Sequence, residues 1–416
     1  MREKLKILFI HNTAIWYRIP FFKQLALDYD LHLVFTHFDV LSSIYNSTTT
    51  RNINGLEGVN YTILENDKKG NAQNLDKILK DDYDIIIGGS WDSIAELRET
   101  IKISRYAHKH NIPFIIWRED WDWRRPNNIK QKILDKTIKY LTQKADQILV
   151  PGSIHKQYFQ KLGVKPENIT IMPNVSNIKG YNPDIIQNTN IKTILYVGRL
   201  IKRKGVIYLI KAFKKLHKKH ENVRLIIVGE GDEEKTLKKY IKDHKIPDIT
   251  FTGKIPNNQL KDYYQMANLV VVPSTDDEMG DPWVFILNEA MYYSNPVIAT
   301  DAVGAAYDMI EDNGYMVKQR NPDELYIKMD EIISNPKIEE SMSKKSKEII
   351  DKKYQYKNMT NAFDNAIKKV KKWEKKGRIE LNSYLLIIFF LVNIFKEAIY
   401  YFWNFSWVNI IITITS

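Results

Sequence analysis

The fold is decided most clearly by residues Lys192–Gly205, which read KTILYV and then GRLIKRKG. The first six residues are a short apolar run that predicts a buried strand. A basic turn containing glycine follows, and a helical pattern then runs from Val206 to about His220. A strand that leads through such a turn into a helix is one unit of a parallel α/β sheet, and the start of the helix offers free backbone N–H groups to an anion.

Short apolar runs alternate with helical patterns along the rest of the chain, which is typical of βαβ units. Between the two halves, Asn174–Asn190 is rich in Asn, Pro and Gly, has no periodicity and is the best linker candidate. We therefore predict an α/β protein with two Rossmann-like domains, residues 1–178 and 190–353, that face each other across a cleft. The other expected strands are Leu5–Ile10, Leu31–Phe35, Tyr83–Ile87, Pro113–Trp117, Gln147–Val150, Ile169–Met172, Val223–Val228, Asp248–Phe251, Leu269–Val272, Pro296–Ala299 and Gly314–Val317.

The composition limits the classes of partner and of chemistry. The 416 residues are enough for two or three domains with buried cores. The 62 Lys and Arg residues exceed the 50 Asp and Glu residues, which suits nucleotides, nucleic acid or acidic lipid, but a compositional bias toward lysine is an equal alternative. The basic residues are dispersed and no nucleic-acid-binding module is recognised, so nucleic acid is not expected as a partner. The absence of cysteine excludes disulfides, cysteine nucleophiles and thiolate zinc sites.

The two ends of the chain suggest where the protein works. Residues 1–10 lead directly into the first expected strand without a signal-peptide cleavage site, so we expect a cytoplasmic catalytic body. At the other end we expect a crossover helix at 354–375 that returns to the first domain, and then a basic and hydrophobic tail at 376–416. The last 19 residues are uncharged, which predicts association with the anionic inner face of a membrane. Whether the tail spans or lies on the membrane is open, and an oligomerisation tail or a buried hairpin is the alternative.

Two carboxylates, Asp281 and Glu289, are separated by seven residues across a predicted helix start. This spacing places Asp281 at the mouth of the helix and Glu289 two turns further along the same side, so one can meet sugar hydroxyls and the other a ribose diol. Free amides near Trp283–Phe285 can face phosphate or sugar oxygens. Arg199 can hold phosphate through its planar guanidinium and Lys204 can add a point charge, although a solvated basic loop is the alternative.

Several motifs of the second half follow one another in a fixed order. They are Gly198-Arg199-Leu200 with Lys204-Gly205, Val228-Gly229-Glu230-Gly231, Phe251-Thr252-Gly253, Val272-Pro273-Ser274, the acid pair and Pro296-Val297-Ile298-Ala299-Thr300. Together they resemble the family 4 retaining glycosyltransferases. The resemblance covers about Lys192–Met316 and is looser in the first half. It implies the GT-B fold, in which two Rossmann-like domains hold a nucleotide sugar mainly through the second domain.

The resemblance also implies roles for individual residues. Gly198, Arg199 and Lys204 would hold the diphosphate of the donor. Asp281 would contact the donor sugar and Glu289 the nucleotide ribose. The other donor-site residues that it implies are Lys254 and Ile255 beside the base, and Trp283, Val284 and Phe285 beside the phosphates or the sugar. Members of the family generally work without metal, so no cofactor or metal is expected, and the acidic run Asp276–Glu278 is interpreted as a solvated loop rather than a metal site.

Two residues depart from the family pattern. Asp281 stands where a glutamate is usual and is one methylene shorter. Val284 stands where a glycine is usual, and a β-branched side chain limits how closely the backbone can approach a ligand. The amide contacts at Val284, the identity of the sugar and even turnover therefore depend on how this valine is accommodated.

Aromatic and charged residues that follow expected strands of the first half predict the acceptor side. Trp16 and Arg18 follow the first strand, and Trp91 and Asp92 follow a pair of glycines, for which a simple turn is the alternative. A third run interleaves tryptophan, acidic and arginine residues, a surface that suits sugar rings and charged head groups. Within it, Glu119 is a candidate sugar-contacting or catalytic acid, and a structural ion pair with a nearby arginine is the alternative.

The leading hypothesis is a retaining glycosyltransferase that moves a sugar from a UDP- or GDP-sugar to a lipid-linked or polysaccharide acceptor. The expected catalytic residues are Arg199 and Lys204, which would stabilise the leaving diphosphate, together with Asp281 and Glu119. A nucleotide-sugar epimerase of the same fold is the second hypothesis. The third is an inactive membrane-bound scaffold, for which Val284 is the main support.

Overall fold

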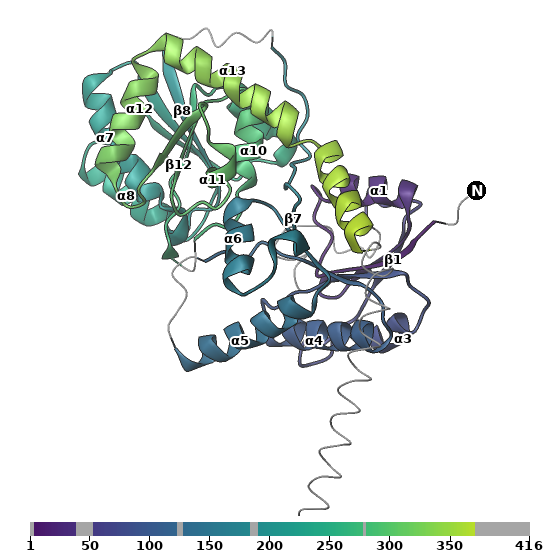
Figure 1. Cartoon of the computed structure of the whole chain (residues 1–416). Coiled ribbons are helices and arrows are strands. Elements are labelled where there is room, and N and C mark those ends of the chain that lie inside the picture. The colour runs from purple at the N-terminus through teal and green to yellow at the C-terminus, as the bar shows by residue number, and fades with distance from the viewer. Residues whose placement is uncertain (1–3, 39–52, 123–127, 184–189, 278–279, 371–416) are drawn as a thin grey trace, which may run out of the picture. The chain divides into compact units, whose positions relative to one another are not determined.

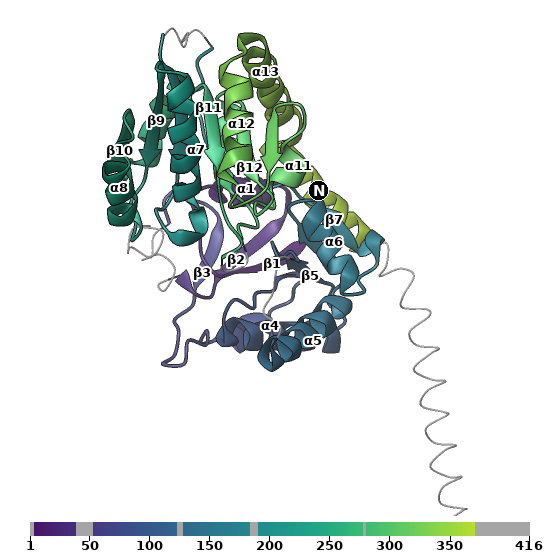
Figure 2. The same cartoon turned by 90° about the vertical axis from the view of Figure 1, so that its left-hand side faces the viewer.

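The computed structural model describes residues 4–38, 53–122, 128–183, 190–277 and 280–370 (Figure 1). These residues contain two parallel sheets, one in each half of the chain (Figures 1 and 2). The predicted α/β architecture with two Rossmann-like domains is thereby confirmed. None of the helices in the described ranges is both long and apolar enough to cross a bilayer, and the predicted tail at 376–416 lies outside those ranges.

The first sheet has seven parallel strands in the order β3-β2-β1-β4-β5-β6-β7. The strand order reverses between β1 and β4, and in open α/β sheets ligands bind outside the carboxyl ends of the strands at such a switch point. The register aligns the ends of β1 and β2, with His11 opposite Phe35, so the segments that follow both strands reach the same edge. The strands are β1 (Lys6–His11), β2 (Asp30–Phe35), β3 (Asn60–Ile63), β4 (Ile85–Gly88), β5 (Phe114–Trp117), β6 (Gln147–Val150) and β7 (Ile169–Ile171).

The second sheet has six parallel strands in the order β10-β9-β8-β11-β12-β13. Its switch point lies between β8 and β11, so the loops after these two strands are the expected ligand-binding loops. The strands are β8 (Lys192–Val197), β9 (Val223–Val228), β10 (Ile249–Gly253), β11 (Leu269–Val272), β12 (Val297–Thr300) and β13 (Gly314–Val317).

Helices follow the strands in both halves, as the alternating pattern predicts. In the first half they are α1 (Ile19–Asp28), α3 (Leu75–Leu79), α4 (Ile94–Lys109), α5 (Ile129–Lys144) and α6 (Ser153–Lys161). In the second half they are α7 (Val206–Lys219), α8 (Glu234–Asp243), α9 (Leu260–Met266), α10 (Phe285–Tyr292), α11 (Ala306–Met309), α12 (Pro322–Ile333) and α13 (Pro336–Lys353).

The strands of the second sheet are buried on both faces because helices cover both. In β8, Ile194 and Tyr196 enter one apolar cluster together with α7 and α12, and Leu195 enters the opposite cluster together with α9 and α10. In the first sheet, Phe9 of β1 packs edge-on against Phe22 of α1, with ring centroids 5.3 Å apart. This two-sided burial explains why the central strands are nearly continuous apolar runs in the sequence.

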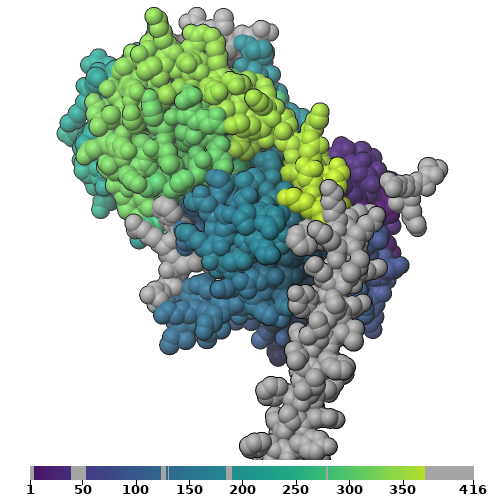
Figure 3. Space-filling model, viewed as in Figure 1, coloured from purple at the N-terminus to yellow at the C-terminus, as the bar shows by residue number. Residues whose placement is uncertain are grey.

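A further helix, over residues 356–370, follows α13. Residues 1–364 form one compact unit and residues 365–416 a second. Within the first unit, Phe363 stacks on Phe9 with ring centroids 6.3 Å apart, and the Tyr29 hydroxyl donates to Asp364 at 2.7 Å. In Figure 3 the yellow surface that contains residues 356–364 lies beside the purple surface of the first described residues. The chain therefore returns to the first sheet within the segment predicted as a crossover helix.

One strand, β3, was not predicted from the sequence. Asn60–Ile63 is an edge strand with the sequence NYTI, and none of its four residues is fully buried. A buried apolar run is therefore absent, and pairing with β2, from His32 opposite Asn60 to Phe35 opposite Ile63, is what makes the segment a strand. The other strands lie where the apolar runs predict them, with ends shifted by at most two residues.

Candidate active site

A glycine holds the basic loop after β8 against the turn after β11. Gly205 has φ of +63° just before α7, and a Cβ atom there would lie 2.1 Å from the carbonyl oxygen of Pro273. The amide of Thr275 donates to the carbonyl of Arg203 at 2.8 Å and joins the same two segments. The close approach therefore requires a residue without a side chain, and it fixes the short 3-10 turn Lys202–Lys204 at the edge of the second sheet.

Asp281 is the centre of a buried charge cluster. Its carboxylate accepts from the ammonium of Lys204 at 2.8 Å, pairs with the guanidinium of Arg203 and accepts from the hydroxyl of Ser274. Burial, followed by the charges of Arg203 and Arg199, lowers the pKa of Lys204 to about 7. Two cations and a hydroxyl thus converge on one carboxylate, which is a geometry suited to an anionic ligand.

Arg199 is not among the partners of Asp281. Its side chain is exposed and, within the described ranges, forms no hydrogen bond or ion pair. Its carbonyl accepts from the hydroxyl of Tyr196 at 2.9 Å. Arg203, which the sequence analysis did not single out, stands beside Asp281 instead. The only sequence signal for Arg203 was its place in the basic run between Arg199 and Gly205.

The helix α10 begins a few residues after Asp281. Val284 is the residue before its first turn, with φ −115° and ψ 107°, which a β-branched residue adopts without strain. Its side chain is buried in an apolar cluster with Trp283, so the family glycine is not needed for the backbone conformation. Phe285, the first residue of the helix, packs against Tyr17 of the first half with ring centroids 4.0 Å apart.

The second acid of the pair has a different set of partners. Glu289 lies on α10 and accepts from the hydroxyl of Tyr264 at 2.7 Å and from that of Ser176 at 3.2 Å. Burial raises the pKa of Glu289 to about 7, against the effect of these two hydrogen bonds. Of the residues predicted beside a base, Lys254 is exposed and Ile255 is half-buried, and both follow β10 directly.

On the acceptor side, Glu119 forms an ion pair with Arg18 at 2.8 Å and also accepts from the side chain of Asn174 at 2.8 Å. The Arg18 guanidinium contacts His11 Nε2 at 2.7 Å and lies 4.1 Å from the ring centroid of Trp117. Burial and the charge of Arg18 lower the pKa of His11, so that this histidine is neutral. The structure thus shows the ion pair with an arginine that the sequence left as an alternative, and a sugar contact by Glu119 stays a prediction.

The other predicted acceptor-side residues gather around a second arginine. Arg118 pairs with Asp92 at 2.7 Å and with Asp120 at 2.6 Å, and it lies 4.6 Å from the ring centroid of Trp91. The indole N–H of Trp91 donates to Asp120 at 2.9 Å. Trp16 stays at the surface and is 38% exposed. Arg118 and Asp120 were part of the interleaved run in the sequence, but their pairing with residues after β4 was not predictable from it.

A cavity of about 570 Å³ joins these groups to the second half of the chain. Arg18, Asp92 and Glu119 line it from the first half, and Gly280 and Pro282, which flank Asp281, line it from the second. The imidazole of His155 donates to the carbonyl of Pro282 at 3.1 Å and contributes to the same junction. The cavity therefore connects the predicted acceptor side with the surroundings of the charge cluster.

Comparison with known proteins agrees with this geometry. Residues 182–349 match the family model described as glycosyl transferases group 1. Over these residues the chain is similar to members of that family. An uncharacterized glycosyltransferase of Haemophilus influenzae is 31% identical over 57% of this chain and 65% of its own length. The lipopolysaccharide 1,2-N-acetylglucosaminetransferase of Salmonella typhimurium is 25% identical over 53% of this chain and 62% of its own length. The chain thus spans less than two thirds of either relative.

The fold is shared with solved structures at lower sequence identity. The crystal structure of Anabaena Alr3699/HepE in complex with UDP superposes with a TM-score of 0.70 at 17% identity, covering 88% of this chain and 100% of that one. The GT-B arrangement of two Rossmann-like domains that the glycosyltransferase resemblance implied is therefore shown.

The acidic run after β11 is engaged with an arginine. Asp276 pairs with Arg320, and Asp277 lies 3.1 Å from the same guanidinium, whereas Glu278 lies outside the described ranges. No group of three His, Asp or Glu side chains with the geometry of a metal site occurs in the part of the chain that the structure describes. Catalysis without a metal ion stays a prediction.

Proposed function

We propose that this chain is a retaining glycosyltransferase that transfers a sugar from a UDP- or GDP-sugar to a lipid-linked or polysaccharide acceptor. The observation that carries the proposal is the convergence of Lys204 and Arg203 on Asp281 in the loops after β8 and β11. Anions bind at this edge of open α/β sheets, where loop N–H groups and cationic side chains meet. The family match of residues 182–349 supports the same activity.

In the proposed donor complex, Lys204 and Arg203 exchange the Asp281 carboxylate for the diphosphate, and the exposed guanidinium of Arg199 closes on it. Asp281 then accepts a hydrogen bond from a hydroxyl of the donor sugar. Negative charge grows on the diphosphate as its bond to the sugar breaks, and fixed cations in a buried site stabilise that charge strongly. Lys204 and Arg199 are therefore assigned to catalysis, with Arg203 as an added cation.

The nucleoside lies along α10 and the end of β10 in this proposal. Glu289 accepts from the ribose hydroxyls, and its carboxylate is oriented by Tyr264 and Ser176. The base lies beside Lys254 and Ile255. The UDP complex of the Anabaena protein with the same fold supports a uridine nucleotide as the first candidate, and GDP is the second.

The acceptor occupies the cavity on the side of the first sheet. Its hydroxyl oxygen forms the new bond to the anomeric carbon on the face from which the diphosphate leaves, and a phosphate oxygen takes the hydroxyl proton. Transfer by this route needs no protein base and no metal ion. The paired side chains Arg18 and Glu119 hold the cavity wall in place beside the reacting sugar.

We also propose that the acceptor is presented at an anionic membrane surface, with α5 as the docking element. Three large side chains of α5 are exposed at spacings that place them on one helix face, namely Ile129, Ile133 and Tyr140, at 77%, 61% and 58%. Exposed lysines surround them on the same helix: Lys132, Lys136, Lys139 and Lys144. Apolar residues flanked by lysines are typical of helices that lie in the interface of an anionic membrane.

The donor site is tested first by binding. UDP and GDP are added to the full chain and thermal unfolding is followed, with Lys204→Ala and the exposed neighbour Lys202→Ala as a matched pair. UDP should raise the Tm of the wild type and of Lys202→Ala, and the shift should be lost in Lys204→Ala because a charge-assisted contact to phosphate is worth about 1.5–3 kcal/mol. A shift retained in Lys204→Ala contradicts the assignment.

Transfer is tested with radiolabelled nucleotide sugars and a membrane extract. The proposal predicts that label enters the lipid or polysaccharide fraction and that the product keeps the anomeric configuration of the donor. Conversion of the nucleotide sugar without any acceptor indicates the epimerase instead. Absence of binding to every nucleoside diphosphate indicates the inactive scaffold.

A further inference from the structure

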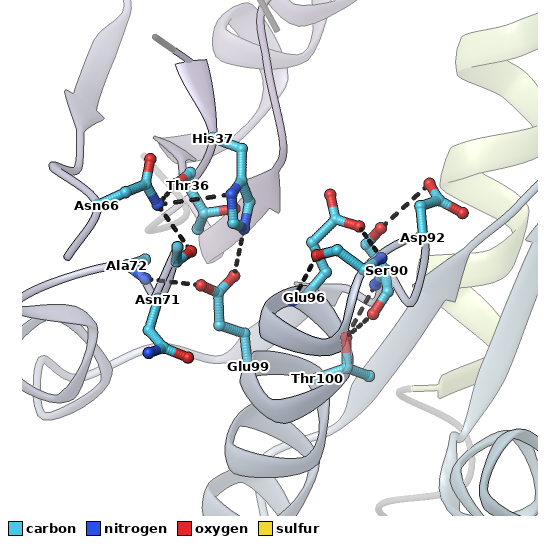
Figure 4. A network of polar contacts seen from close by, with 12 residues as sticks. Thr36, His37, Asn66, Asn71, Ala72, Ser90, Asp92, Glu96, Glu99 and Thr100 are labelled. Atoms are coloured by element: carbon cyan, nitrogen blue, oxygen red, sulfur yellow. Dashed lines mark hydrogen bonds and ion pairs between the residues drawn. The ribbon is translucent and has the colours of Figure 1, made fainter. Parts of the chain in front are cut away.

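The wall of the cavity contains carboxylates that the proposed transfer reaction does not use. Glu96 and Glu99 lie three residues apart on α4, so they share one helix face, and both line the cavity. His37 faces them from the segment after β2, as Figure 4 shows. The two glutamates and His37 are each less than 10% exposed. Buried carboxylates at a cavity wall need a partner or a ligand.

Glu99 has its partners within the protein. One carboxylate oxygen accepts from the amide of Ala72 at 2.7 Å, and the other lies 3.1 Å from Nε2 of His37 (Figure 4). Burial opposes protonation of His37, but the hydrogen bond and charge of Glu99, with the charge of Glu96, raise its pKa. The pair Glu99–His37 is thus a fixed, largely self-neutralised part of the wall.

Glu96 forms no direct ion pair with any residue that the structure describes. One of its oxygens accepts from the amide of Ser93 at 3.0 Å and completes the capping box of α4, in which the Ser93 hydroxyl accepts from the amide of Glu96. The second oxygen has no hydrogen-bond partner among the residues that the structure describes, and Figure 4 shows it without a contact. A residue that is 6% exposed therefore presents an unpaired carboxylate oxygen at the cavity.

The arginines of the cavity do not offset this charge. Arg18 is neutralised by Glu119, and Arg118 by Asp92 and Asp120. Among the described residues that line the cavity, five carboxylates therefore face two guanidinium groups. An anionic group brought to Glu96 would meet a like charge in a buried setting, whereas a hydroxyl or an ammonium group would donate to it.

We propose that Glu96 determines the acceptor class: it accepts a hydrogen bond from a hydroxyl or amino group of the acceptor sugar and excludes sugar units that carry a carboxylate or phosphate at that position. This inference rests on the proposed transferase function, because it takes the cavity as the acceptor site. The terminal unit of the acceptor is then an uncharged or amino-bearing sugar. Exclusion arises from repulsion of the wrong ligand as much as from contact with the right one.

The test uses the full chain saturated with UDP, and measures binding of methyl glycosides by saturation-transfer difference NMR. The probes are the methyl glycosides of glucose, galactose and mannose, with their 2-amino and uronic acid counterparts. At least one uncharged or amino glycoside should bind, and its uronic acid counterpart should bind about tenfold more weakly, since a like-charge contact costs at least about that factor.

Glu96→Gln is the decisive variant, because glutamine keeps the capping box while it removes the charge. It should fold with an unchanged Tm and reduce the discrimination against the uronic acid to about twofold or less, whereas Glu221→Gln at an exposed position should leave the discrimination intact. Equal binding of both classes by the wild type, binding of no glycoside, or discrimination that survives in Glu96→Gln overturns the inference. Binding of UDP is measured in the same samples, so that failure of the donor-site proposal can be distinguished from failure of the inference about Glu96. Loss of UDP binding counts against the transferase function, whereas absence of discrimination by the wild type with UDP bound counts against Glu96 alone.

Discussion

At the residue scale, the two acids of the candidate donor site are in contrasting environments. Asp281 is neutralised by Lys204 and Arg203, whereas Glu289 is buried with two hydroxyl partners and forms no ion pair with any residue that the structure describes. The first arrangement stabilises the ionised carboxylate, and the second favours the protonated one. The same motif therefore contains one acid, Asp281, that serves as an internal counter-ion. The other, Glu289, lies in an environment suited to a neutral ligand that carries hydroxyl groups.

The raised pKa of Glu289 predicts a stabilising substitution. As pH rises from about 4.5 to about 7, this glutamate ionises in the unfolded chain but keeps its proton in the folded one, so folding stability falls through that window and the full deficit remains above it. Glu289→Gln removes the deficit and keeps an acceptor for Tyr264. Chemical denaturation should show a gain on the order of 1–3 kcal/mol at pH 8 that shrinks toward zero near pH 4.5. Glu221→Gln, at an exposed site, is the control, and a variant less stable than the wild type at pH 8 contradicts the prediction.

At the same scale, a side chain added at Gly205 is expected to clash with a neighbouring backbone carbonyl. Gly205→Ala places a Cβ atom 2.1 Å from the Pro273 carbonyl oxygen, so the loop that carries Lys204 must move. Gly58→Ala is the matched control, because Gly58 also has positive φ, at +79°, but has no atom within 4 Å of the added Cβ. The control should lose about 1 kcal/mol in urea unfolding, and Gly205→Ala about 3 kcal/mol or more, with loss of the UDP-induced Tm shift. Equal losses for the two variants would show that backbone strain alone, and not the close approach, matters at Gly205.

At the element scale, α5 combines a buried face with an exposed apolar face. Ile138 and Leu141 are almost fully buried, whereas Ile129 and Ile133 are more than half exposed. A helix that needed only to cover the sheet would carry polar residues on its outer face. The lysines around the exposed residues make an anionic lipid surface the occupant that matches the face in both polarity and charge.

Membrane docking by α5 predicts a charge-reversal effect. The double variant Ile129→Glu with Ile133→Glu should sediment with vesicles of 30 mol% phosphatidylglycerol at least about tenfold less than the wild type, because it loses two apolar contacts and gains two repulsive charges. Unfolding should be unchanged, since both side chains are exposed. Leu27→Glu, at an exposed apolar residue of α1, should sediment like the wild type. Vesicle binding by the double variant equal to that of the wild type would rule out α5 as the docking element.

At the scale of the whole molecule, one contact between the two halves of the first compact unit involves the start of a helix. Asp308 of α11 accepts from the amide of Ser153 at 2.8 Å, at the N-terminus of α6. Gly152 permits this approach, because a Cβ atom there would lie 2.3 Å from the same carboxylate. A carboxylate from the second half thus caps a helix of the first half.

Removal of this cap should loosen the contact between the halves without unfolding either sheet. Asp308→Ala should lower the free energy of unfolding by about 1–2 kcal/mol, since it removes a charge-assisted hydrogen bond at a helix start. Hydrogen exchange should rise at the amides of α6 and not in β8. Asp323→Ala, at an exposed position of α12, is the control. Unchanged exchange in α6 is the result that contradicts the role of Asp308.

Sequence patterns alone determined the parts of this protein that depend on neighbours in the chain. The parallel sheets follow from apolar runs alternating with helical patterns, the loop of Lys204 follows from a glycine before a helix, and the acid pair follows from helical spacing. The edge strand β3 could not be predicted, because its residues show no alternation of buried and exposed positions and it forms a strand only by pairing with β2.

Only the tertiary structure decided which side chains meet. Arg203 rather than Arg199 contacts Asp281, Arg18 contacts Glu119 across 101 residues, and Ser176 contacts Glu289 across 113. These partners arise because parallel strands carry distant segments to the same edge of a sheet, where buried charged groups come close enough to pair. Local spacing constrains the backbone, and charge pairing in a buried site is settled by the whole fold.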